Sequence, residues 1–318
     1  SEGGTGVQKA ASQQEPGVQR SVRRFVWARR FAYLSLLAVV LSVPTAGAAF
    51  AATAANPTNR WTATTWTYTS QVNSMAPWLY WKLDETTGTT AADSSSNGRT
   101  GTYRTGNANS ASGFTRGITG ANTASSPNRA VTLNGTTACI NTTSTTAMTA
   151  PVEITEVVWF KTTSTNGGKL FGFEQPRTGV AVAGSGGTYD RHLYMDGSGK
   201  VWFGVYNGGY FTVGSSSTLN DGAWHMAVGQ MGTGGMKLWI DGVLQSTNAN
   251  AAGEGTTGWF RAGCGNLAGW GGSWNGGNSP TTNSGATQDR PFAGSLDEIS
   301  VWQSVLTPDQ IAMLWAAH

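Results

Sequence analysis

The tryptophans near the C-terminal end of the chain are the residues whose chemistry is most suggestive. The chain has 14 Trp, and Trp259, Trp270 and Trp274 lie in or beside a Gly/Asn/Ser-rich stretch over residues 258–285. A long polar loop in a compact domain usually serves a function or lacks order. Exposed indole rings can stack on the C–H face of a sugar while Asn275 bonds its hydroxyls. This pattern predicts a ligand-binding loop with Trp270 and Trp274 exposed; the alternative left open is that the rings cap the core.

Other aromatic and polar residues could extend this surface. Trp202 and Tyr206 precede a predicted Asn207-Gly208 turn and Tyr210 follows it. An earlier loop supplies three more candidates, which are Tyr189, Asp190 and Arg191. Of these residues, Trp202 and Tyr206 are predicted to bind the ligand together with the Trp-rich loop.

Paired carboxylates, which glycoside hydrolases need, occur only in unsuitable spacings. A retaining site needs two carboxyl groups about 5–5.5 Å apart. Glu153 and Glu156 are three residues apart, and Asp297 and Glu298 are adjacent, so on a regular strand each pair points to opposite faces. No Gly-x-Ser-x-Gly motif is present, and none of the three histidines has metal-ligand spacing. We therefore expect no enzyme activity, and an atypical glycoside hydrolase remains as an alternative.

The charge of the chain is divided unevenly along its length. The first 55 residues hold six Lys/Arg against two Glu, whereas the rest holds fourteen Lys/Arg against fifteen Asp/Glu. Nucleic-acid binding needs a basic stripe on the folded surface, so this division argues against it. Gly supplies 44 of 318 residues and charged residues only 12%, which argues against a helical bundle, a coiled coil or a charged disordered chain.

Residues 1–55 have the order of an export signal. A basic tail with five closely spaced arginines precedes an uncharged run over residues 31–55, which ends in small residues after Pro44. This order is that of a secretory signal peptide, and we expect cleavage near Ala48 or Ala51. The alternative is a retained membrane anchor, because an uncharged run of this length can span a bilayer of about 30 Å. Both interpretations predict a secreted or cell-surface protein.

The remainder of the chain has the pattern of an all-β domain. Residues 56–76, rich in Thr, Asn and Ser, are interpreted as a linker, and residues 77–318 as one domain in which short apolar segments recur between turn residues. Met236, Leu238 and Ile240 alternate with polar positions and Trp239, so Trp239 is expected to face water or a ligand. A capping sequence, Thr307-Pro308-Asp309-Gln310, predicts a short C-terminal helix.

Four blocks of sequence, in order, resemble the laminin G-like domains of the concanavalin A-like superfamily. The blocks are Leu79-Tyr80-Trp81-Lys82-Leu83-Asp84-Glu85 with the following Gly88–Gly98 segment, Trp224-His225, Leu238-Trp239-Ile240-Asp241-Gly242, and Leu296-Asp297-Glu298-Ile299 with Val301-Trp302. The resemblance implies a two-sheet antiparallel jelly-roll sandwich. It leaves the ligand open, because function on this scaffold depends on loops and on the concave sheet face.

The resemblance also implies a structural calcium ion. Members of the family often carry one near the junction of the first loop and the last strand, where Asp93, Asn97 and Asp297 of this chain lie. Calcium prefers six to eight oxygen ligands, which carboxylate and amide groups supply. The alternative left open is that Asp93 and Asn97 make turn hydrogen bonds and that Asp297 pairs with an arginine.

The two cysteines, Cys139 and Cys264, are expected to form a disulfide, because the domain is predicted to be exported to an oxidising compartment. Together these features predict a secreted or cell-surface, non-catalytic module that binds a glycan. An adhesive module that binds another surface protein is the alternative. A membrane is expected as a partner only if residues 31–55 stay as an anchor.

Overall fold

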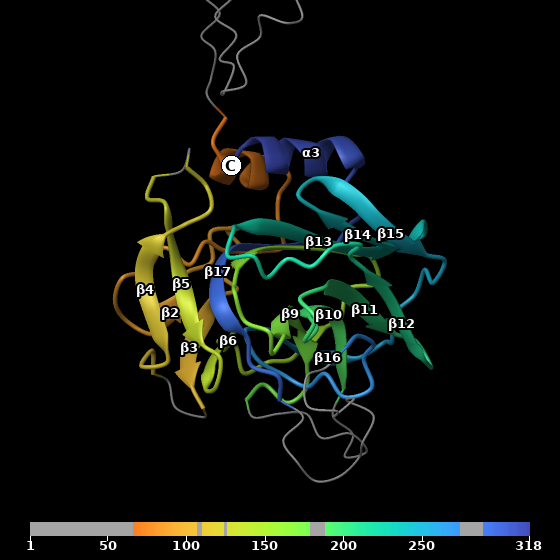
Figure 1. Ribbon diagram of the computed structural model, residues 1–318, viewed down its shortest axis with the longest axis horizontal. Helices are drawn as coiled ribbons and strands as arrows, with labels where there is room; N and C mark the ends of the chain where they lie inside the picture. The colour runs from red at the N-terminus through yellow and green to blue at the C-terminus, as the bar shows by residue number, and fades with distance from the viewer. Residues whose placement is uncertain (1–65, 107–109, 124–125, 179–187, 274–288) are drawn as a thin grey trace, which may run out of the picture. The chain divides into compact units, whose positions relative to one another are not determined.

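The computed structural model describes residues 66–106, 110–123, 126–178, 188–273 and 289–318. Within these ranges the chain forms two stacked antiparallel sheets and two short helices (Figure 1). The predicted all-β jelly-roll sandwich is therefore confirmed. In the described residues, no helix is both long and apolar enough to cross a membrane.

The first sheet has eight described strands. Along the sheet the order is β15-β14-β13-β8-β17-β5-β4, and β1 also pairs with β17. The strands are β1 (Leu79–Trp81), β4 (Phe114–Thr119), β5 (Arg129–Asn134), β8 (Ile154–Lys161), β13 (His225–Gly232), β14 (Gly235–Ile240), β15 (Val243–Asn248) and β17 (Ala293–Trp302). Because β8 and β17 lie in its middle, their residues are buried on both faces.

The second sheet has nine described strands. The order is β12-β11-β10-β9-β16-β6-β3-β2, and β7 pairs with β16. The strands are β2 (Thr90–Ala91), β3 (Gly101–Thr105), β6 (Ala138–Thr142), β7 (Met148–Thr149), β9 (Gly168–Glu174), β10 (Tyr189–Met195), β11 (Val201–Tyr206), β12 (Tyr210–Gly214) and β16 (Thr257–Ala262). The predicted turn at Asn207-Gly208 joins β11 to β12.

The core lies between the two sheets. Leu170, Phe171, Leu193 and Phe203 of the nine-stranded sheet meet Val158 and other side chains of the eight-stranded sheet in one buried cluster. The alternation predicted for residues 236–240 places Met236, Leu238 and Ile240 in this cluster. Burying apolar side chains from both sheets is the main stabilising contribution in such a sandwich.

The two helices cover the outer face of the eight-stranded sheet (Figure 1). Helix α3 (Pro308–Ala316) begins with the predicted capping box, in which Thr307 and Gln310 bond each other's backbone N–H groups. Helix α2 (Tyr68–Ser74) lies within the segment interpreted as a linker, and its Tyr68 and Val72 are buried. The compact unit thus begins at Trp66, because these two side chains belong to its packed interior.

Trp239 points away from the sandwich core, as the alternation predicts, yet it is buried. It is only 8% exposed, because it packs in the cluster beneath α2 and α3. The alternation correctly predicted that Trp239 points away from the sandwich core. The expectation that it faces water or a ligand is wrong, because the helices cover that face.

Candidate functional site

The outer face of the nine-stranded sheet carries a group of partly exposed aromatic side chains. Tyr189 begins β10, Trp202 and Tyr206 lie on β11, and Tyr210 begins β12. These three strands are neighbours, and the ring of Tyr206 packs edge-on against that of Tyr210, with the two centroids 5.2 Å apart. We call these four residues the aromatic face. Tyr210 is 48% exposed, so this surface is open to a ligand.

Trp270 lies against the aromatic face and is buried, with 1% of its surface exposed. Its ring centroid is 5.1 Å from that of Tyr210 and 5.0 Å from that of His192. A Cβ atom added at Gly204 of β11 would come within 2.4 Å of the indole. The glycine therefore leaves the space that the indole fills, and the prediction that Trp270 is exposed is wrong.

Hydrogen bonds fix the loop that carries Trp270 to the sheet. The hydroxyl of Tyr194 donates to the carbonyl of Gly271 at 2.8 Å, and the backbone N–H of Ser273 donates to Oδ2 of Asp196 at 3.0 Å. The same carboxyl oxygen accepts from Nε1 of Trp202 at 3.0 Å. Although burial acts to raise it, these hydrogen bonds keep the pKa of Asp196 below its ordinary value. The ionised carboxylate thus holds both the loop and the ring of Trp202.

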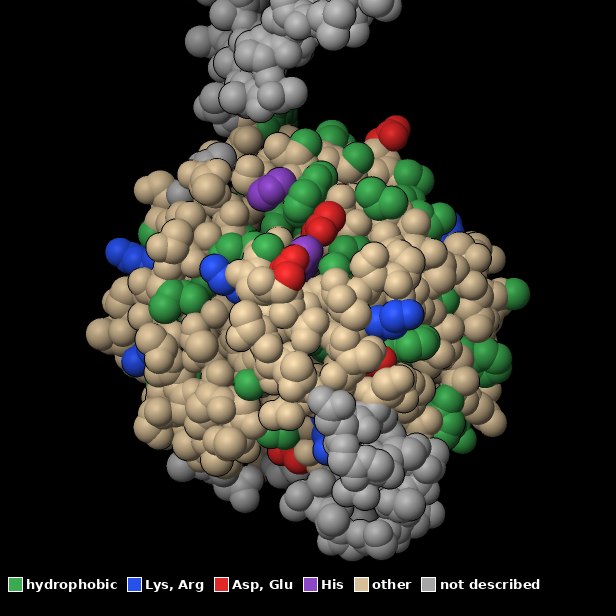
Figure 2. Space-filling view, in the orientation of Figure 1, with side chains coloured by type: hydrophobic (Ala, Val, Ile, Leu, Met, Phe, Trp, Pro, Cys, Tyr) green, Lys and Arg blue, Asp and Glu red, His purple; other side chains and the backbone are tan. Residues whose placement is uncertain are grey.

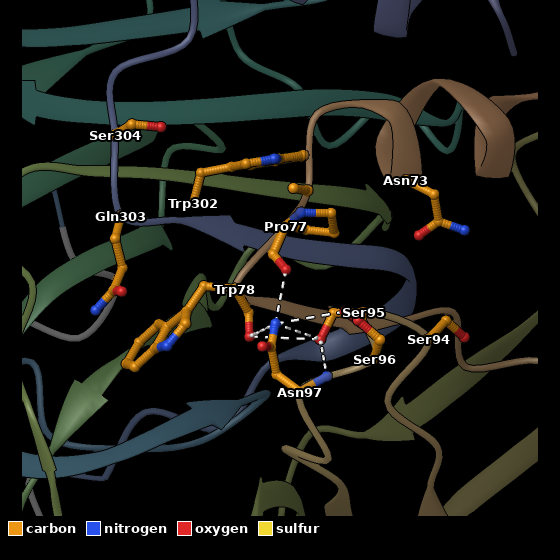
Figure 3. Close-up of a pocket in the computed structure, with 11 residues that line it drawn as sticks. Asn73, Pro77, Trp78, Ser94, Ser95, Ser96, Asn97, Trp302, Gln303 and Ser304 are labelled. Carbon is orange, nitrogen blue, oxygen red and sulfur yellow. Dashed lines mark hydrogen bonds between the residues drawn. The ribbon is translucent and has the colours of Figure 1, made fainter.

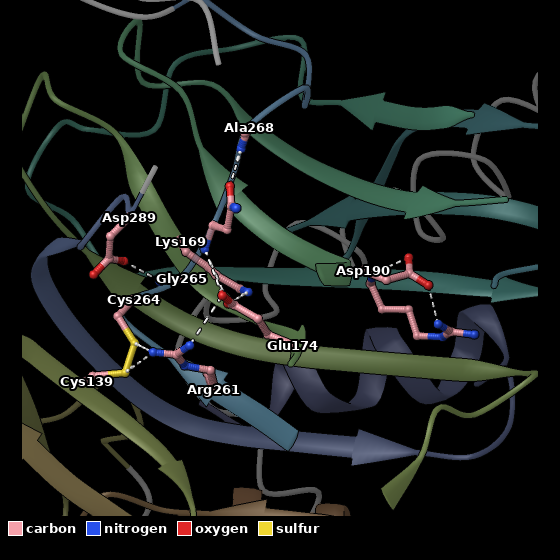
Figure 4. Close-up of polar contacts among 11 residues, drawn as sticks. Cys139, Lys169, Glu174, Asp190, Arg261, Cys264, Gly265, Ala268 and Asp289 are labelled. Atoms are coloured by element: carbon pink, nitrogen blue, oxygen red, sulfur yellow. Dashed lines mark hydrogen bonds and ion pairs between the residues drawn. A yellow bond between two sulfur atoms is a disulfide. The ribbon is translucent and has the colours of Figure 1, made fainter. Parts of the chain in front are cut away.

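A buried ionic cluster holds the beginning of the same loop (Figure 4). Glu174 of β9 lies 2.9 Å from Nζ of Lys169 and 3.3 Å from Nη1 of Arg261. It also accepts a hydrogen bond from the backbone N–H of Asn266. Burial lowers the pKa of Lys169, and Glu174 opposes that effect. Glu174 therefore joins Lys169 and Arg261 to the backbone of Asn266, and so holds the loop against the sheet.

The cysteines also tie this loop to the sheet. Cys139 of β6 and Cys264, just after β16, form a disulfide with their Cα atoms 5.2 Å apart. This is the pairing that the sequence predicted. Nη2 of Arg261 lies 3.2 Å from the sulfur of Cys264 (Figure 4). The covalent link and the ionic cluster therefore meet at the base of the loop.

His192 lies between the sheet and Trp270. Its side chain is fully buried, and within the described residues neither ring nitrogen makes a hydrogen bond of normal geometry. Burial lowers the pKa of His192 well below its ordinary value, and the nearby cations Lys169 and Arg191 lower it further. The imidazole is therefore neutral and supports the indole of Trp270, with which it makes an edge-to-face contact.

The other residues predicted for the ligand site are dispersed. Trp259 of β16 is partly buried, and its Nε1 donates to the carbonyl of Ser144 at 2.9 Å, so it is apart from the aromatic face. Trp274 and Asn275 lie outside the described residues. Asp190 and Arg191, considered as additional surface groups, form a buried ion pair instead.

Tyr189 and Tyr210 were considered only as additions to the loop, yet they are central to the surface that the structure shows. The glycines within these aromatic strands are a sequence signal that could have indicated this surface. Gly204 and Gly214 each lie directly under an indole, that of Trp270 and that of Trp202 respectively. Glycines inside aromatic strands indicate close approach of another group to the sheet.

Asp93 and Asn97, two of the three predicted calcium ligands, are turn residues. Asp93 accepts hydrogen bonds from three backbone N–H groups at 2.6–3.0 Å. Asn97 donates its side-chain amide to the carbonyl of Pro77 at 3.0 Å. The turn alternative left open by the sequence therefore describes both residues, and neither contacts Asp297 through a hydrogen bond given by the structure.

Asp297 of β17 is buried, and the side chain of Asn128 lies near it. Oδ2 of Asp297 accepts from the backbone N–H of Ala121 at 2.8 Å, whereas Oδ1 of Asp297 and Oδ1 of Asn128 have no hydrogen-bond partner among the residues that the structure describes. A Cβ atom added at Gly120 would lie 2.6 Å from Oδ2 of Asp297 and 2.5 Å from Oδ1 of Asn128. Buried oxygens without donors are costly unless a cation or water binds them. Asp297 and Asn128 could therefore supply two of the six to eight oxygen ligands that a calcium ion prefers.

The remaining donors of such a site would be amide and backbone oxygens. In the part of the chain that the structure describes, no three His, Cys, Asp or Glu side chains lie together in a metal-binding arrangement. Next to Asp297, Glu298 accepts a hydrogen bond from the hydroxyl of Tyr80. Burial raises the pKa of Glu298 to about 8. Both carboxyl groups are almost completely buried, so this pair cannot reach a polysaccharide.

Comparison with solved structures finds 253 chains that are similar to this one, and three of them are given below. A sialidase of Trypanosoma rangeli, in complex with 2,3-difluorosialic acid, has a TM-score of 0.48 and 12% identity over 77% of this chain and 33% of its own. Domain 4 of an extracellular arabinanase from Geobacillus stearothermophilus, in complex with arabinotriose, has a TM-score of 0.47 and 18% identity, covering 74% of this chain and 96% of the domain.

The third structure is the CBM40 module of a Ruminococcus gnavus sialidase, bound to α2,3-sialyllactose. Its TM-score is 0.37 and its identity 21%, over 52% of this chain and 83% of the module. This chain thus spans about a third of the length of the trypanosome sialidase. No curated protein matches the sequence.

A laminin G family model, described as the concanavalin A-like lectin/glucanases superfamily, matches residues 133–312. The match covers strands of both sheets, the loop that carries Trp270, and most of α3. It also contains all four residues of the aromatic face, which are Tyr189, Trp202, Tyr206 and Tyr210. The chain belongs to the concanavalin A-like lectin/glucanases superfamily.

Proposed function

We propose that this protein is a non-catalytic glycan-binding module and that the aromatic face is its binding surface. The observation that carries the proposal is the set of four partly exposed rings on three adjacent strands, Tyr189, Trp202, Tyr206 and Tyr210. Aromatic rings offer a flat apolar face for the C–H groups of a sugar, and tyrosine hydroxyls and the indole N–H offer hydrogen bonds. Membership in a family of lectins and glucanases supports this proposal.

The surface chemistry also supports a ligand of low charge. Uncharged polar side chains and backbone dominate the side of the molecule seen in Figure 2, and charged side chains are scattered across it. The aromatic face itself is built from uncharged side chains. Its rings are supported from below by the buried Trp270 and His192, so they are held in place before a ligand binds, which reduces the entropic cost of binding.

The lack of catalysis is proposed from the state of the nearby carboxylates. Glu174 is held by Lys169, and Asp190 is held by Arg191. Asp196 accepts hydrogen bonds from several donors. A glycoside hydrolase needs one carboxyl group free to donate a proton and a second free to attack or to activate water. Each of these three groups already has a structural partner.

The test of glycan binding is the double substitution Tyr206→Ala/Tyr210→Ala. We expect the Kd for a bound oligosaccharide, found on a glycan array and measured by calorimetry, to rise at least tenfold, since exposed aromatic anchors dominate such sites. Met313→Ala is the matched control, because Met313 on α3 is 44% exposed, close to the 48% of Tyr210. Unchanged affinity in the double variant contradicts the site, and release of reducing ends from a polysaccharide contradicts the absence of catalysis.

We further propose that Asp297 and Asn128, whose oxygens both lie beside Gly120, contribute to a structural calcium site. A bound ion would supply the positive charge that these buried oxygens lack, and would stabilise the folded state by mass action. Calcium should raise the melting temperature of the wild-type protein, and Asp297→Ala should abolish that increase. Asp93→Ala is the control, since Asp93 lies in a turn and should leave the calcium increment in place. Identical melting curves in chelator and in millimolar calcium contradict the proposal.

Export is proposed from the order of residues in the N-terminal segment, which lies outside the described residues. The disulfide between Cys139 and Cys264 supports it, because disulfides persist mainly in oxidising compartments. N-terminal sequencing of the expressed full-length chain should give a start near Ala49 or Ala52. An intact Ser1 in the membrane fraction would show a retained anchor instead.

A further inference from the structure

A pocket lies beside the end of α2, and its lining residues do not include those of the aromatic face (Figure 3). Its volume is about 620 Å³, which is within the range of about 300–1,000 Å³ typical of small-molecule sites. Four segments line it: the end of α2, the start of β1, the turn over residues 94–97, and the residues that follow β17. We call it the α2 pocket.

The lining of the α2 pocket is uncharged and rich in groups that both donate and accept hydrogen bonds. The side chains of Asn73 and Gln303 contribute amides, and those of Ser94, Ser96 and Ser304 contribute hydroxyls. In Figure 3, Asn73 and Gln303 lie on opposite sides of the view. No Lys, Arg, His, Asp or Glu is among the described residues that line the pocket.

Apolar surface completes the pocket. Trp78, Pro77 and Ala76 lie along one wall, and Trp302 lies along another. Trp78 is partly exposed, with the guanidinium carbon of Arg99 4.4 Å from the centroid of its ring, whereas Pro77 is buried and Trp302 is 2% exposed. Hydroxyl and amide groups beside an aromatic ring match the alternation of hydroxyl and C–H groups around a sugar ring.

The base of the α2 pocket is fixed by internal hydrogen bonds. The amide of Asn97 donates to the carbonyls of Pro77 at 3.0 Å and of Trp78 at 3.2 Å (Figure 3). Nε1 of Trp302 donates to the carbonyl of Met75 at 3.0 Å. A site whose walls are already ordered binds with a smaller loss of conformational entropy.

We propose that the α2 pocket binds one residue of an uncharged sugar, at a site separate from the aromatic face. Together the two sites would make the domain bivalent for a glycan chain or for two chains. The assignment of a neutral ligand follows from the uncharged lining. The assignment of a saccharide follows from the number of hydroxyl and amide groups relative to the small apolar area.

The experiment is a titration of the wild-type protein with neutral trisaccharides, namely maltotriose, cellotriose, arabinotriose and chitotriose, followed by saturation-transfer NMR and calorimetry. Asn73→Ala/Gln303→Ala should weaken binding of one of them about tenfold, and Ser304→Tyr should block it by filling the pocket. All three substituted side chains are exposed, so the fold is expected to persist. Tyr206→Ala/Tyr210→Ala is the control and should leave this binding event unchanged.

The outcomes separate this proposal from the function proposed for the aromatic face. If every trisaccharide binds both pocket variants as tightly as the wild type, the α2 pocket is not a saccharide site. If binding is lost only in Tyr206→Ala/Tyr210→Ala, the aromatic face is the sole site and the second site is excluded. Binding of peptides, with no neutral sugar bound at the pocket, also overturns the proposal.

Discussion

The outer faces of the two sheets both carry tryptophans, and they differ in what covers them. On the eight-stranded sheet, Trp159 and Trp302 are buried beneath α2 and α3 in one apolar cluster. On the nine-stranded sheet, Trp270 is buried by its own polar loop, and Trp202 beside it stays partly exposed. The same residue type thus serves packing on one face and is available for binding on the other.

The difference follows from the covering elements. The helices bring aliphatic side chains such as Val72, Ile311 and Leu314 against the sheet, and these exclude water from the rings below. The loop over the other sheet brings Leu267 and Trp270 with many glycines and polar residues. In the part of this loop that the structure describes, Leu267 and Trp270 are buried, whereas Tyr210 beside them is 48% exposed. Substitutions on each face should therefore differ in their effect on stability.

The largest effect is expected for Trp159→Ala on the helix-covered face. The ring is fully buried, stacks on Trp315 at 5.4 Å and meets Tyr68 edge-on at 5.9 Å. Removing a buried Trp leaves a large cavity and should lower the free energy of unfolding by about 3–5 kcal/mol. Chemical denaturation measures this loss. A loss below about 1 kcal/mol would show that the helices collapse onto the space.

The disulfide should matter next, because it ties down the loop-covered face. Cys139→Ser/Cys264→Ser opens a link between residues 125 positions apart, and the expected loss of stability is about 2–5 kcal/mol. Hydrogen exchange should rise more in residues 263–273 than in α3. Equal protection of the loop in the variant and the wild type would show that the ionic cluster alone holds it.

Trp270→Ala should have a smaller effect on stability. The ring is buried, but its Nε1 has no partner, and the loop can settle onto the space it leaves. We expect a loss of about 2–3 kcal/mol, with weaker glycan binding because Tyr210 loses its supporting ring. Tyr194→Phe is the control, since it removes only the hydrogen bond to Gly271. Unchanged stability would show that the Trp270 side chain is solvent-exposed in solution, as the sequence pattern predicted.

The smallest effect is expected for a histidine on the eight-stranded sheet. Nδ1 of His225 lies 2.8 Å from Asp241 and Nε2 lies 3.2 Å from Asp221, and the hydrogen bond to Asp241 is the main cause of its raised pKa. A raised folded-state pKa means that the added stability is full below about pH 6.5 and is lost as the pH rises through the folded-state value.

The measurement is the difference in melting temperature between wild type and His225→Gln as a function of pH. The wild type should be more stable by less than about 1 kcal/mol at pH 5.5, and this advantage should disappear at alkaline pH. Comparing the two proteins cancels the titration of all other groups. A pH-independent difference would mean that His225 is neutral in the folded state.

The local sequence pattern determined the fold class and several elements. Alternation placed Met236, Leu238 and Ile240 in the core, and the Thr307–Gln310 capping pattern marked the start of α3. Periodicity and capping act over a few residues, so they can be read without knowing the fold. Strands β3 and β4 contain several Thr and Gly residues, and β6 is a short segment of mixed small, polar and apolar residues. Because all three lack a strong apolar pattern, they were not predicted.

Tertiary structure alone decided which outward-facing rings are exposed. Alternation shows that Trp239 and Trp202 both point away from the core. The helices cover Trp239, whereas Trp202, on the other sheet, stays partly exposed. The same holds for Trp270, which is buried because Gly204, 66 positions earlier in the chain, leaves space for its indole. Oδ1 of Asn128 and Oδ2 of Asp297 likewise both lie beside Gly120, although 169 positions separate the two residues in the chain. Exposure depends on contacts between residues far apart in the chain, whereas a local pattern records only the direction in which each side chain points.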